Sequence, residues 1–171
     1  FGGGTPTILE GYQLAAILET VKEHFNITTD AEITVECNPG TLTAGKAEKL
    51  VQAGFNRLSM GLQSADDKEL QLLGRIHNFA QFLESYDLAR KAGFRNINVD
   101  LMSALPGQTL KSWQDTLQKV TALRPEHISA YSLIIEEGTP FGERYGSEEG
   151  RKLLPDEDSE RELYHETKRF L

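Results

Sequence analysis

Hydrophobic and polar residues alternate along four short segments of the chain, and glycine, proline or small polar residues lie close to each segment. An alternation with a period of two is typical of β-strands with one buried face and one polar face. We therefore predict strands at Glu32–Glu36, Arg57–Gln63, Asn96–Leu101 and His127–Ile134.

Between these segments, apolar residues recur three or four residues apart, as on the buried face of an amphipathic helix. A shorter helix is predicted at Ala44–Ala53, before Gly54, and another from about Asp66, where Ser64 and Asp67 are spaced like a capping box. Three longer helices are marked by Leu14, Ile17, Leu18, Val21 and Phe25, by Phe79, Phe82, Leu83 and Tyr86, and by Leu110, Trp113, Leu117 and Val120.

Helices separate the consecutive strands, and this order favours parallel pairing with right-handed crossovers. The similar sequences Gln52–Phe55 (QAGF) and Lys91–Phe94 (KAGF) each precede a predicted strand. Their glycines are 39 residues apart, which fits one helix-and-strand unit. The predicted fold class is therefore α/β with a parallel sheet.

The predicted strands sort their side chains into one apolar face and one polar face. Strands buried on both faces in a parallel sheet are usually apolar almost throughout, so a polar face indicates an open or incomplete barrel whose concave side binds a ligand. The apolar set is Ile33, Val35, Leu58, Met60, Leu62, Ile97 and Val99, and the polar set is Thr34, Glu36, Arg57, Ser59, Gly61, Gln63, Asn98 and Asp100.

Composition limits the class of protein. The 171 residues suit one domain or a piece of one, and 26 acidic against 18 basic residues, a net charge of −8, argue against nucleic acid or an anionic membrane as partner. The single cysteine, Cys37, and the lack of a signal or membrane-spanning pattern favour the cytoplasm and no stable membrane insertion. Four scattered histidines, His24, His77, His127 and His165, have no metal-binding spacing and are expected to be exposed or half-buried.

Three polar residues, Glu36, Gln63 and Asp100, fall near the carboxyl ends of predicted strands, where parallel α/β proteins bind their ligands. The glycine run Gly2–Thr5 and Arg75 are expected at the same rim. Carboxylates, an amide, an arginine and bare backbone suit a ligand with hydroxyls, an ammonium and a carboxylate. Each residue alone could equally be a turn or cap residue.

The glycine run FGGGTP has an open alternative as a phosphate cradle in an unrelated barrel enzyme, or as an ordinary turn. It matches neither the G-x-x-x-x-G-K-[ST] nor the G-x-G-x-x-G nucleotide motif.

Six motifs together resemble one family. The chain from Phe1 to about Phe141 is similar to radical S-adenosylmethionine proteins of the group related to oxygen-independent coproporphyrinogen III oxidase. Within that group the NPGT, LGRIH and IIEEGTPF segments are more similar to the heme-chaperone branch than to the oxidase. The motifs are FGGGTP, VECNPGTL, GFNRLSMGLQS, LGRIH, NINVDLMSALPGQT and HISAYSLIIEEGTPF.

The resemblance implies a partial parallel (β/α)6 barrel of the TIM type that holds S-adenosylmethionine and a [4Fe–4S] cluster. By motif, Gly3, Gly4 and Thr5 are expected to contact the methionine ammonium and Arg75 its carboxylate. The other expected contacts are Glu36, Gln63 and Asp100 to ribose or ammonium groups, and Ile134 to adenine.

The chain departs from the family pattern because the three cysteines of the C-x-x-x-C-x-x-C cluster loop are absent, and Cys37 is expected to be a packed residue instead. The last helix, from the acidic run 156–159 through Leu171, carries no stop signal. Residues 1–171 are therefore expected to be the central part of a radical S-adenosylmethionine core domain, without the cluster-binding unit and the C-terminal domain, and inactive alone.

Two functions follow from the resemblance. A heme chaperone would bind heme and pass it to an acceptor protein, whereas an oxidase would convert coproporphyrinogen III to protoporphyrinogen IX by oxidative decarboxylation through a 5′-deoxyadenosyl radical. Both use a tetrapyrrole as partner.

Overall fold

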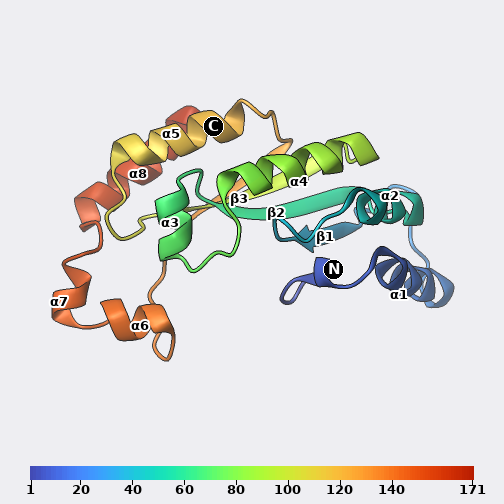
Figure 1. The fold of residues 1–171 in the computed structure, drawn as a ribbon, viewed down its shortest axis with the longest axis horizontal. Helices are drawn as coiled ribbons and strands as arrows, with labels where there is room; N and C mark the ends of the chain where they lie inside the picture. The colour runs from blue at the N-terminus through green and yellow to red at the C-terminus, as the bar shows by residue number, and fades with distance from the viewer. The chain divides into compact units, whose positions relative to one another are not determined.

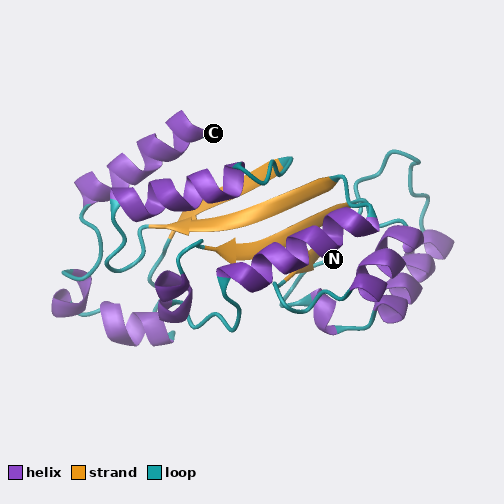
Figure 2. Cartoon of the chain, turned by 45° about the horizontal axis from the view of Figure 1, so that its top comes forward, coloured by secondary structure: helices purple, strands orange, loops and turns teal.

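A computed structural model describes residues 1–171. Four strands form one sheet in the order of the sequence, and Figure 2 shows them side by side in orange. They are β1 (Thr34–Cys37), β2 (Arg57–Gln63), β3 (Asn96–Ser103) and β4 (His127–Ser132). β1 pairs with β2 in parallel, with Thr34 opposite Arg57 and Cys37 opposite Met60. The parallel α/β architecture predicted from the sequence is confirmed.

The helices connect these strands in the predicted alternation, and Figure 1 labels them along the chain. They are the 3-10 turn η1 (Pro6–Ile8) and the α-helices α1 (Gly11–His24), α2 (Ala44–Ala53), α3 (Asp67–Leu72), α4 (Phe79–Ala92), α5 (Leu110–Thr121), α6 (Pro140–Tyr145), α7 (Glu148–Arg151) and α8 (Glu157–Phe170). The pattern of apolar residues did not predict η1, α6 or α7, all of which are six residues or shorter.

The QAGF and KAGF sequences end α2 and α4 in the same way. Gly54 and Gly93 are the C-cap residues, with φ of 109° and 110° in the left-handed region that favours glycine. At the start of each helix a side chain accepts a backbone N–H, Thr43 from Lys46 and Asn78 from Gln81. The QAGF and KAGF sequences therefore mark the ends of two helices that have the same kind of N-cap and C-cap interactions.

The chain divides into two compact units. Unit 1 contains Phe1–Leu62, Ile76–Asp100 and Pro125–Ile128, and unit 2 contains Gln63–Arg75, Leu101–Arg124 and Ser129–Leu171.

Unit 1 buries the apolar face of its strands beneath its helices. α1 packs on α2, as Figure 1 also shows, and α2 contacts α4. The helix packing is close at Gly11, where an added Cβ would lie 3.1 Å from Cβ of Lys49. The core side chains, each at most 2% exposed, include Leu14, Leu18, Val35, Leu50, Phe55, Leu58, Met60, Phe82, Phe94, Ile97 and Val99.

Unit 2 is built around α5, whose Trp113, Leu117 and Val120 are completely buried. α8 packs against α5. Two polar contacts join them, from Trp113 Nε1 to Thr167 Oγ1 (2.9 Å) and from Gln114 Nε2 to Glu166 Oε1 (2.8 Å). The predicted helical stripe on α5 is therefore a core face.

Several sequence-based details were wrong. β3 continues to Ser103, whose carbonyl accepts the N–H of Leu133 (2.9 Å). β4 ends at Ser132, two residues before the predicted end at Ile134. β1 begins at Thr34, two residues after the predicted start, and just before it the Asn56 side chain accepts from Ile33 N (2.8 Å).

The predicted Ser64–Asp67 capping box is also incorrect. Asp66 is the N-cap of α3 and accepts from the backbone N–H groups of Lys68 and Glu69. Ser64 instead accepts from Asp66 N (3.0 Å) and donates to the buried Glu69 carboxylate (2.6 Å).

Not every predicted stripe residue is buried. Ile17 is 44% exposed, and Phe25 is 67% exposed because it lies one residue beyond the end of α1. His77, expected to be exposed or half-buried, is buried, with Nε2 3.3 Å from the carbonyl oxygen of Leu62.

Candidate functional site

The glycine run lies alongside β1 in unit 1. The terminal amino group of Phe1 donates to Thr34 O (2.6 Å), and Phe1 O accepts from Glu36 N (2.9 Å). This pairing brings Gly2 against the Glu36 carboxylate, where an added Cβ would lie 2.7 Å from Oε1. The absence of a side chain at Gly2 therefore makes room for that carboxylate.

Gly3 and Gly4 have a different reason to be glycine. Their φ angles are +87° and +113°, and an added Cβ would meet nothing within 4 Å at either position. Both are exposed, so their backbone groups are open to a ligand. Thr5, which follows them, accepts a hydrogen bond through Oγ1 from Nδ2 of Asn38 (2.7 Å).

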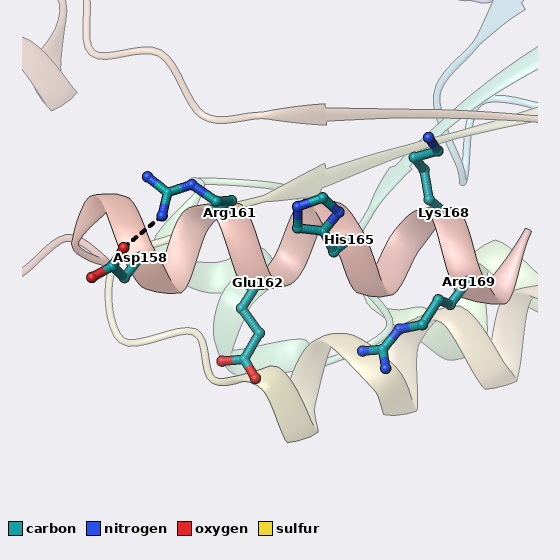
Figure 3. A pocket seen from close by; sticks show the side chains of 6 residues that line it. All are labelled: Asp158, Arg161, Glu162, His165, Lys168 and Arg169. Atoms are coloured by element: carbon teal, nitrogen blue, oxygen red, sulfur yellow. Dashed lines mark hydrogen bonds and ion pairs between the residues drawn. The ribbon is translucent and has the colours of Figure 1, made fainter.

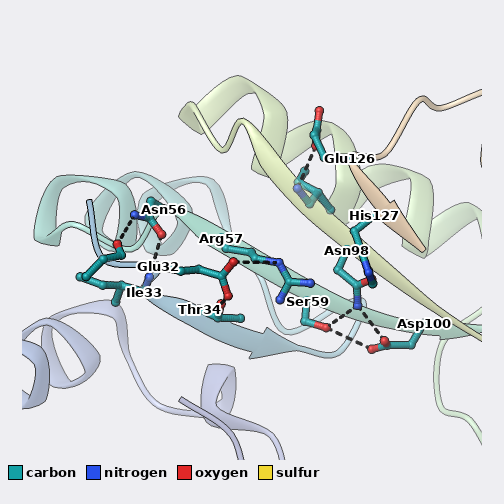
Figure 4. Close-up of polar contacts among 12 residues, drawn as sticks. Glu32, Ile33, Thr34, Asn56, Arg57, Ser59, Asn98, Asp100, Glu126 and His127 are labelled. Carbon is teal, nitrogen blue, oxygen red and sulfur yellow. Dashed lines mark hydrogen bonds and ion pairs between the residues drawn. The ribbon is translucent and has the colours of Figure 1, made fainter. Parts of the chain in front are cut away.

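A row of polar side chains crosses the strands of unit 1, as Figure 4 shows. Glu36 on β1 is opposite Ser59 on β2, and Ser59 Oγ donates to Oδ2 of Asp100 on β3 (3.2 Å). Part of the polar face predicted from alternation is therefore joined by hydrogen bonds between neighbouring strands. Asp100 lies three residues before the end of β3, not at the predicted carboxyl end, because that strand is longer than expected.

Asn98 completes this row and fixes its orientation. Its Nδ2 donates to Asp100 Oδ1 (2.7 Å) and Ser59 Oγ (2.8 Å), so its Oδ1 faces Nδ1 of His127 (2.6 Å). Because a carbonyl oxygen can only accept, Nδ1 of His127 carries the proton. Both carboxylate oxygens of Asp100 thus have a donor from a neighbouring side chain.

Gln63, in unit 2, is the last residue of β2. It is a non-glycine residue with φ of +74°, a conformation that is strained for an L side chain. Its side chain is buried, Nε2 donates to the Tyr131 hydroxyl (3.2 Å), and Oε1 is buried with no hydrogen-bond partner. A desolvated acceptor without a donor is costly, so this oxygen fits a hydroxyl or ammonium group of a ligand.

The other two predicted residues of unit 2 are less enclosed. Arg75 follows α3, is half-buried, and donates its backbone N–H to Leu70 O (2.9 Å). Ile134 is 77% exposed, two residues past the end of β4. The structure thus places Gly3, Gly4, Thr5, Glu36 and Asp100 in unit 1, and Gln63, Arg75 and Ile134 in unit 2.

Sequence reasoning missed three contributors to these contacts. Asn38 holds Thr5, Asn98 holds Asp100, and His127 holds Asn98. Asn98 and Asp100 are two residues apart on one predicted strand face, so their spacing could have indicated a contact. Nothing in the sequence pattern links Asn38 to Thr5, which are 33 residues apart.

A hollow of about 700 Å³ lies along α8. Figure 3 shows that its six lining side chains, all polar or charged, project from this one helix, and Asp158 pairs with Arg161 (2.7 Å). A single helix face with its charges open to water has the chemistry of a solvated surface, so it is not a candidate for binding the ligand described above.

The chain does not supply the ligands of an iron–sulfur cluster. Its one cysteine, Cys37, is buried, and burial raises the pKa of the thiol. No group of three histidine, cysteine or acidic side chains is placed to hold a metal ion. The packed role predicted for Cys37 is confirmed. None of the helices is both long and apolar enough to cross a membrane.

Comparison with known proteins gives consistent findings. The family model described as the Radical SAM superfamily matches residues 1–120. The heme chaperone HemW of Haemophilus influenzae is 39% identical over 170 residues, which cover 99% of this chain and 43% of that protein. The heme chaperone HemW of Bacillus subtilis is 41% identical over 164 residues, which cover 95% and 43%. The chain therefore spans less than half the length of these relatives.

Among solved structures, coproporphyrinogen III oxidase (HemN) from Escherichia coli, described as a radical SAM enzyme, superposes with a TM-score of 0.84 at 30% identity. The superposition covers 99% of this chain and 38% of that one. The archaeal Elp3 of Methanocaldococcus infernus shares the fold at a TM-score of 0.72 and 17% identity.

Proposed function

Because this chain belongs to the radical SAM superfamily, we propose that it binds S-adenosylmethionine through its glycine run and strand-end side chains, and that the full-length protein is a heme chaperone. The family uses S-adenosylmethionine and a [4Fe–4S] cluster. The family resemblance predicted from the six motifs is confirmed by the comparisons.

The residues present fit S-adenosylmethionine, and the observation that carries this proposal is the unpartnered Oε1 of Gln63. Ribose hydroxyls and the methionine ammonium are donors that this oxygen and the exposed Glu36 carboxylate can accept. The open backbone at Gly3 and Gly4 supports close approach of the amino-acid end, and the Arg75 guanidinium suits its carboxylate.

The residues present do not fit the cluster, since one buried thiol replaces the three thiolates that the family motif provides. We assign the cluster ligands to a part of the full-length protein outside these residues. In this proposal the present chain binds and orients the cofactor, and supplies no electron to it.

The cofactor proposal is tested by S-adenosylmethionine binding to the full-length protein, measured by calorimetry. We expect Glu36→Ala and Gln63→Leu each to weaken binding about tenfold, the loss of one hydrogen bond with a charged or desolvated partner. Glu23→Ala, at an exposed carboxylate on α1, is the control and should bind as the wild type does. Unchanged binding in both site variants would refute the proposed site.

The heme-chaperone proposal is supported by several relatives of that name at 37–41% identity. It predicts that the full-length protein binds heme and passes it to a heme-acceptor protein. The test is an absorption titration with heme, followed by mixing with an apo acceptor and separation of the two proteins. Heme that stays on the donor, or never binds it, would contradict the proposal.

A second candidate, oxidative decarboxylation of coproporphyrinogen III, is favoured by the similarity to the HemN structure. The discriminating assay is anaerobic incubation of the reconstituted full-length protein with coproporphyrinogen III, S-adenosylmethionine and a reductant. Formation of protoporphyrinogen IX would favour the oxidase, and its absence together with heme transfer would favour the chaperone.

A further inference from the structure

Lys46 on α2 is a buried lysine whose ammonium contacts only backbone carbonyl groups. The residue is 9% exposed, and Nζ donates to Thr7 O (2.7 Å) and Thr41 O (3.1 Å). Burying an ammonium is expensive even when it is hydrogen-bonded, and apolar residues of similar size are often as stable in such positions. We therefore look for the role of Lys46 in the two chain segments that its hydrogen bonds connect.

The two carbonyls belong to segments far apart in sequence. Thr7 lies in η1, directly after the glycine run, and Thr41 lies in the loop that follows β1. Their hydroxyl groups are also joined, at 2.7 Å. Because the one hydroxyl proton of Thr41 is donated to Asn38 O (2.7 Å), Thr7 is the donor between the two threonines.

Asn38, from the same loop, adds a third connection through its hydrogen bond to Thr5. Together these residues form a buried or half-buried cluster in unit 1, which we call the glycine-run clamp: Thr5, Thr7, Asn38, Thr41 and Lys46. The glycine run is thus fastened at both ends, to β1 through Phe1 and to the clamp through Thr5.

Between these two attachments, Gly3 and Gly4 have no side chains and lie exposed. A free glycine segment has more conformational entropy to lose than any other, and a ligand that orders it pays that cost. Attachment of the flanking residues removes much of this freedom before the ligand arrives.

We propose that Lys46 is a positioning residue for S-adenosylmethionine, which it never touches: its buried ammonium preorganises the glycine run through the clamp. This inference rests on the proposed binding of that cofactor at the glycine run.

The test compares Lys46→Met with Lys46→Arg in the full-length protein. Methionine keeps the apolar volume and removes the ammonium, so we expect about a tenfold weaker affinity for S-adenosylmethionine and faster amide hydrogen exchange over residues 1–8. Arginine can donate to both carbonyls and should restore most of the affinity. Lys49→Met, at an exposed lysine on the same helix, is the matched control and should leave both measurements unchanged.

Asn38→Ala is the second test of the inference, for the case that Lys46→Met does not fold. It removes the hydrogen bond from Asn38 to Thr5 at a half-buried position and should also weaken S-adenosylmethionine binding. Wild-type affinity in the folded Lys46→Met variant, or in Asn38→Ala when only that variant folds, overturns the inference. The proposed S-adenosylmethionine site is refuted independently of this inference if both Glu36→Ala and Gln63→Leu bind the cofactor as the wild type does. Weak binding in those two with normal binding in the clamp variants refutes the positioning role alone.

Discussion

At the scale of single residues, the three glycines of the run perform two different tasks. Gly3 and Gly4 adopt a backbone conformation that favours glycine, whereas Gly2 leaves space for a carboxylate. The sequence indicated close backbone approach here, but it could not separate these tasks, because the neighbour of Gly2 comes from a strand more than 30 residues away.

This difference gives a prediction for Gly2→Ala. The methyl group would collide with the end of the flexible Glu36 side chain, which can swing away, so stability should change by less than about 1 kcal/mol. The displaced carboxylate should nevertheless weaken S-adenosylmethionine binding about tenfold in calorimetry, as one charged hydrogen bond is lost. Gly45→Ala, where an added Cβ meets nothing, is the control for the binding measurement. Normal binding by Gly2→Ala would count against Glu36 as a ligand.

At the scale of elements, helix ends were predicted better than strand ends. The helix α2 was predicted with its observed bounds, because Thr43 and Gly54 form its caps by local chemistry. Strand ends depend on partners elsewhere, such as the Leu133 N–H that pairs with Ser103 and lengthens β3. Because β3 is longer than predicted, Asp100 lies further from the end of the strand than the sequence indicated.

Two glycine-to-alanine variants test this account of the helices. Gly93→Ala places a side chain at φ of 110° and should destabilise the protein by about 1–2 kcal/mol. Gly45→Ala, inside α2, should stabilise it by about 0.5–1 kcal/mol because alanine loses less entropy in a helix. Denaturant unfolding measures both, and equal signs for the two variants would refute the argument.

The ion pair between Arg90 on α4 and Glu126, just before β4, predicts how the stability of the protein depends on pH. Burial raises the pKa of Glu126, but hydrogen bonds from Arg90 and from Ile97 N (2.9 Å each) outweigh it and hold the pKa below its usual value. A lowered folded-state pKa stabilises the protein above the unfolded pKa, about 4.3, and this stability is lost as pH falls through the folded value.

Glu126→Gln should therefore reduce the loss of stability below about pH 4.5. Because the Glu126 side chain is 42% exposed, the effect should be no more than about 1 kcal/mol. Urea unfolding between pH 3 and 7, in steps, measures it. A variant whose stability falls as steeply as that of the wild type would show that this pair does not contribute.

At the scale of the whole molecule, the alternation of elements and the six motifs were sufficient to predict an α/β radical SAM fold, which the comparisons confirm. The pattern could not reveal that the chain forms two compact units, because the division cuts across β2, β3 and β4 rather than falling in a linker. It also gave no sign of the clamp, whose long-range contacts join residues 33 to 39 apart.

The single cysteine of the chain predicts that these 171 residues cannot assemble an iron–sulfur cluster. Anaerobic reconstitution with iron and sulfide should give no cluster absorption in the 171-residue chain, since one buried thiol cannot hold the cluster. In the full-length protein the cluster should form, and Cys37→Ser should not abolish it. Cluster formation by the short chain, or its loss in Cys37→Ser, would contradict the assignment of the ligands elsewhere.

The orientation of the Asn98 amide gives the hydrogen bonds around Asp100 a single direction. Nδ1 of His127 donates to Asn98, and Asn98 in turn donates to Asp100 and Ser59. A carboxylate at position 98 could accept from His127 but could not donate to Asp100, so this network requires an amide at its centre.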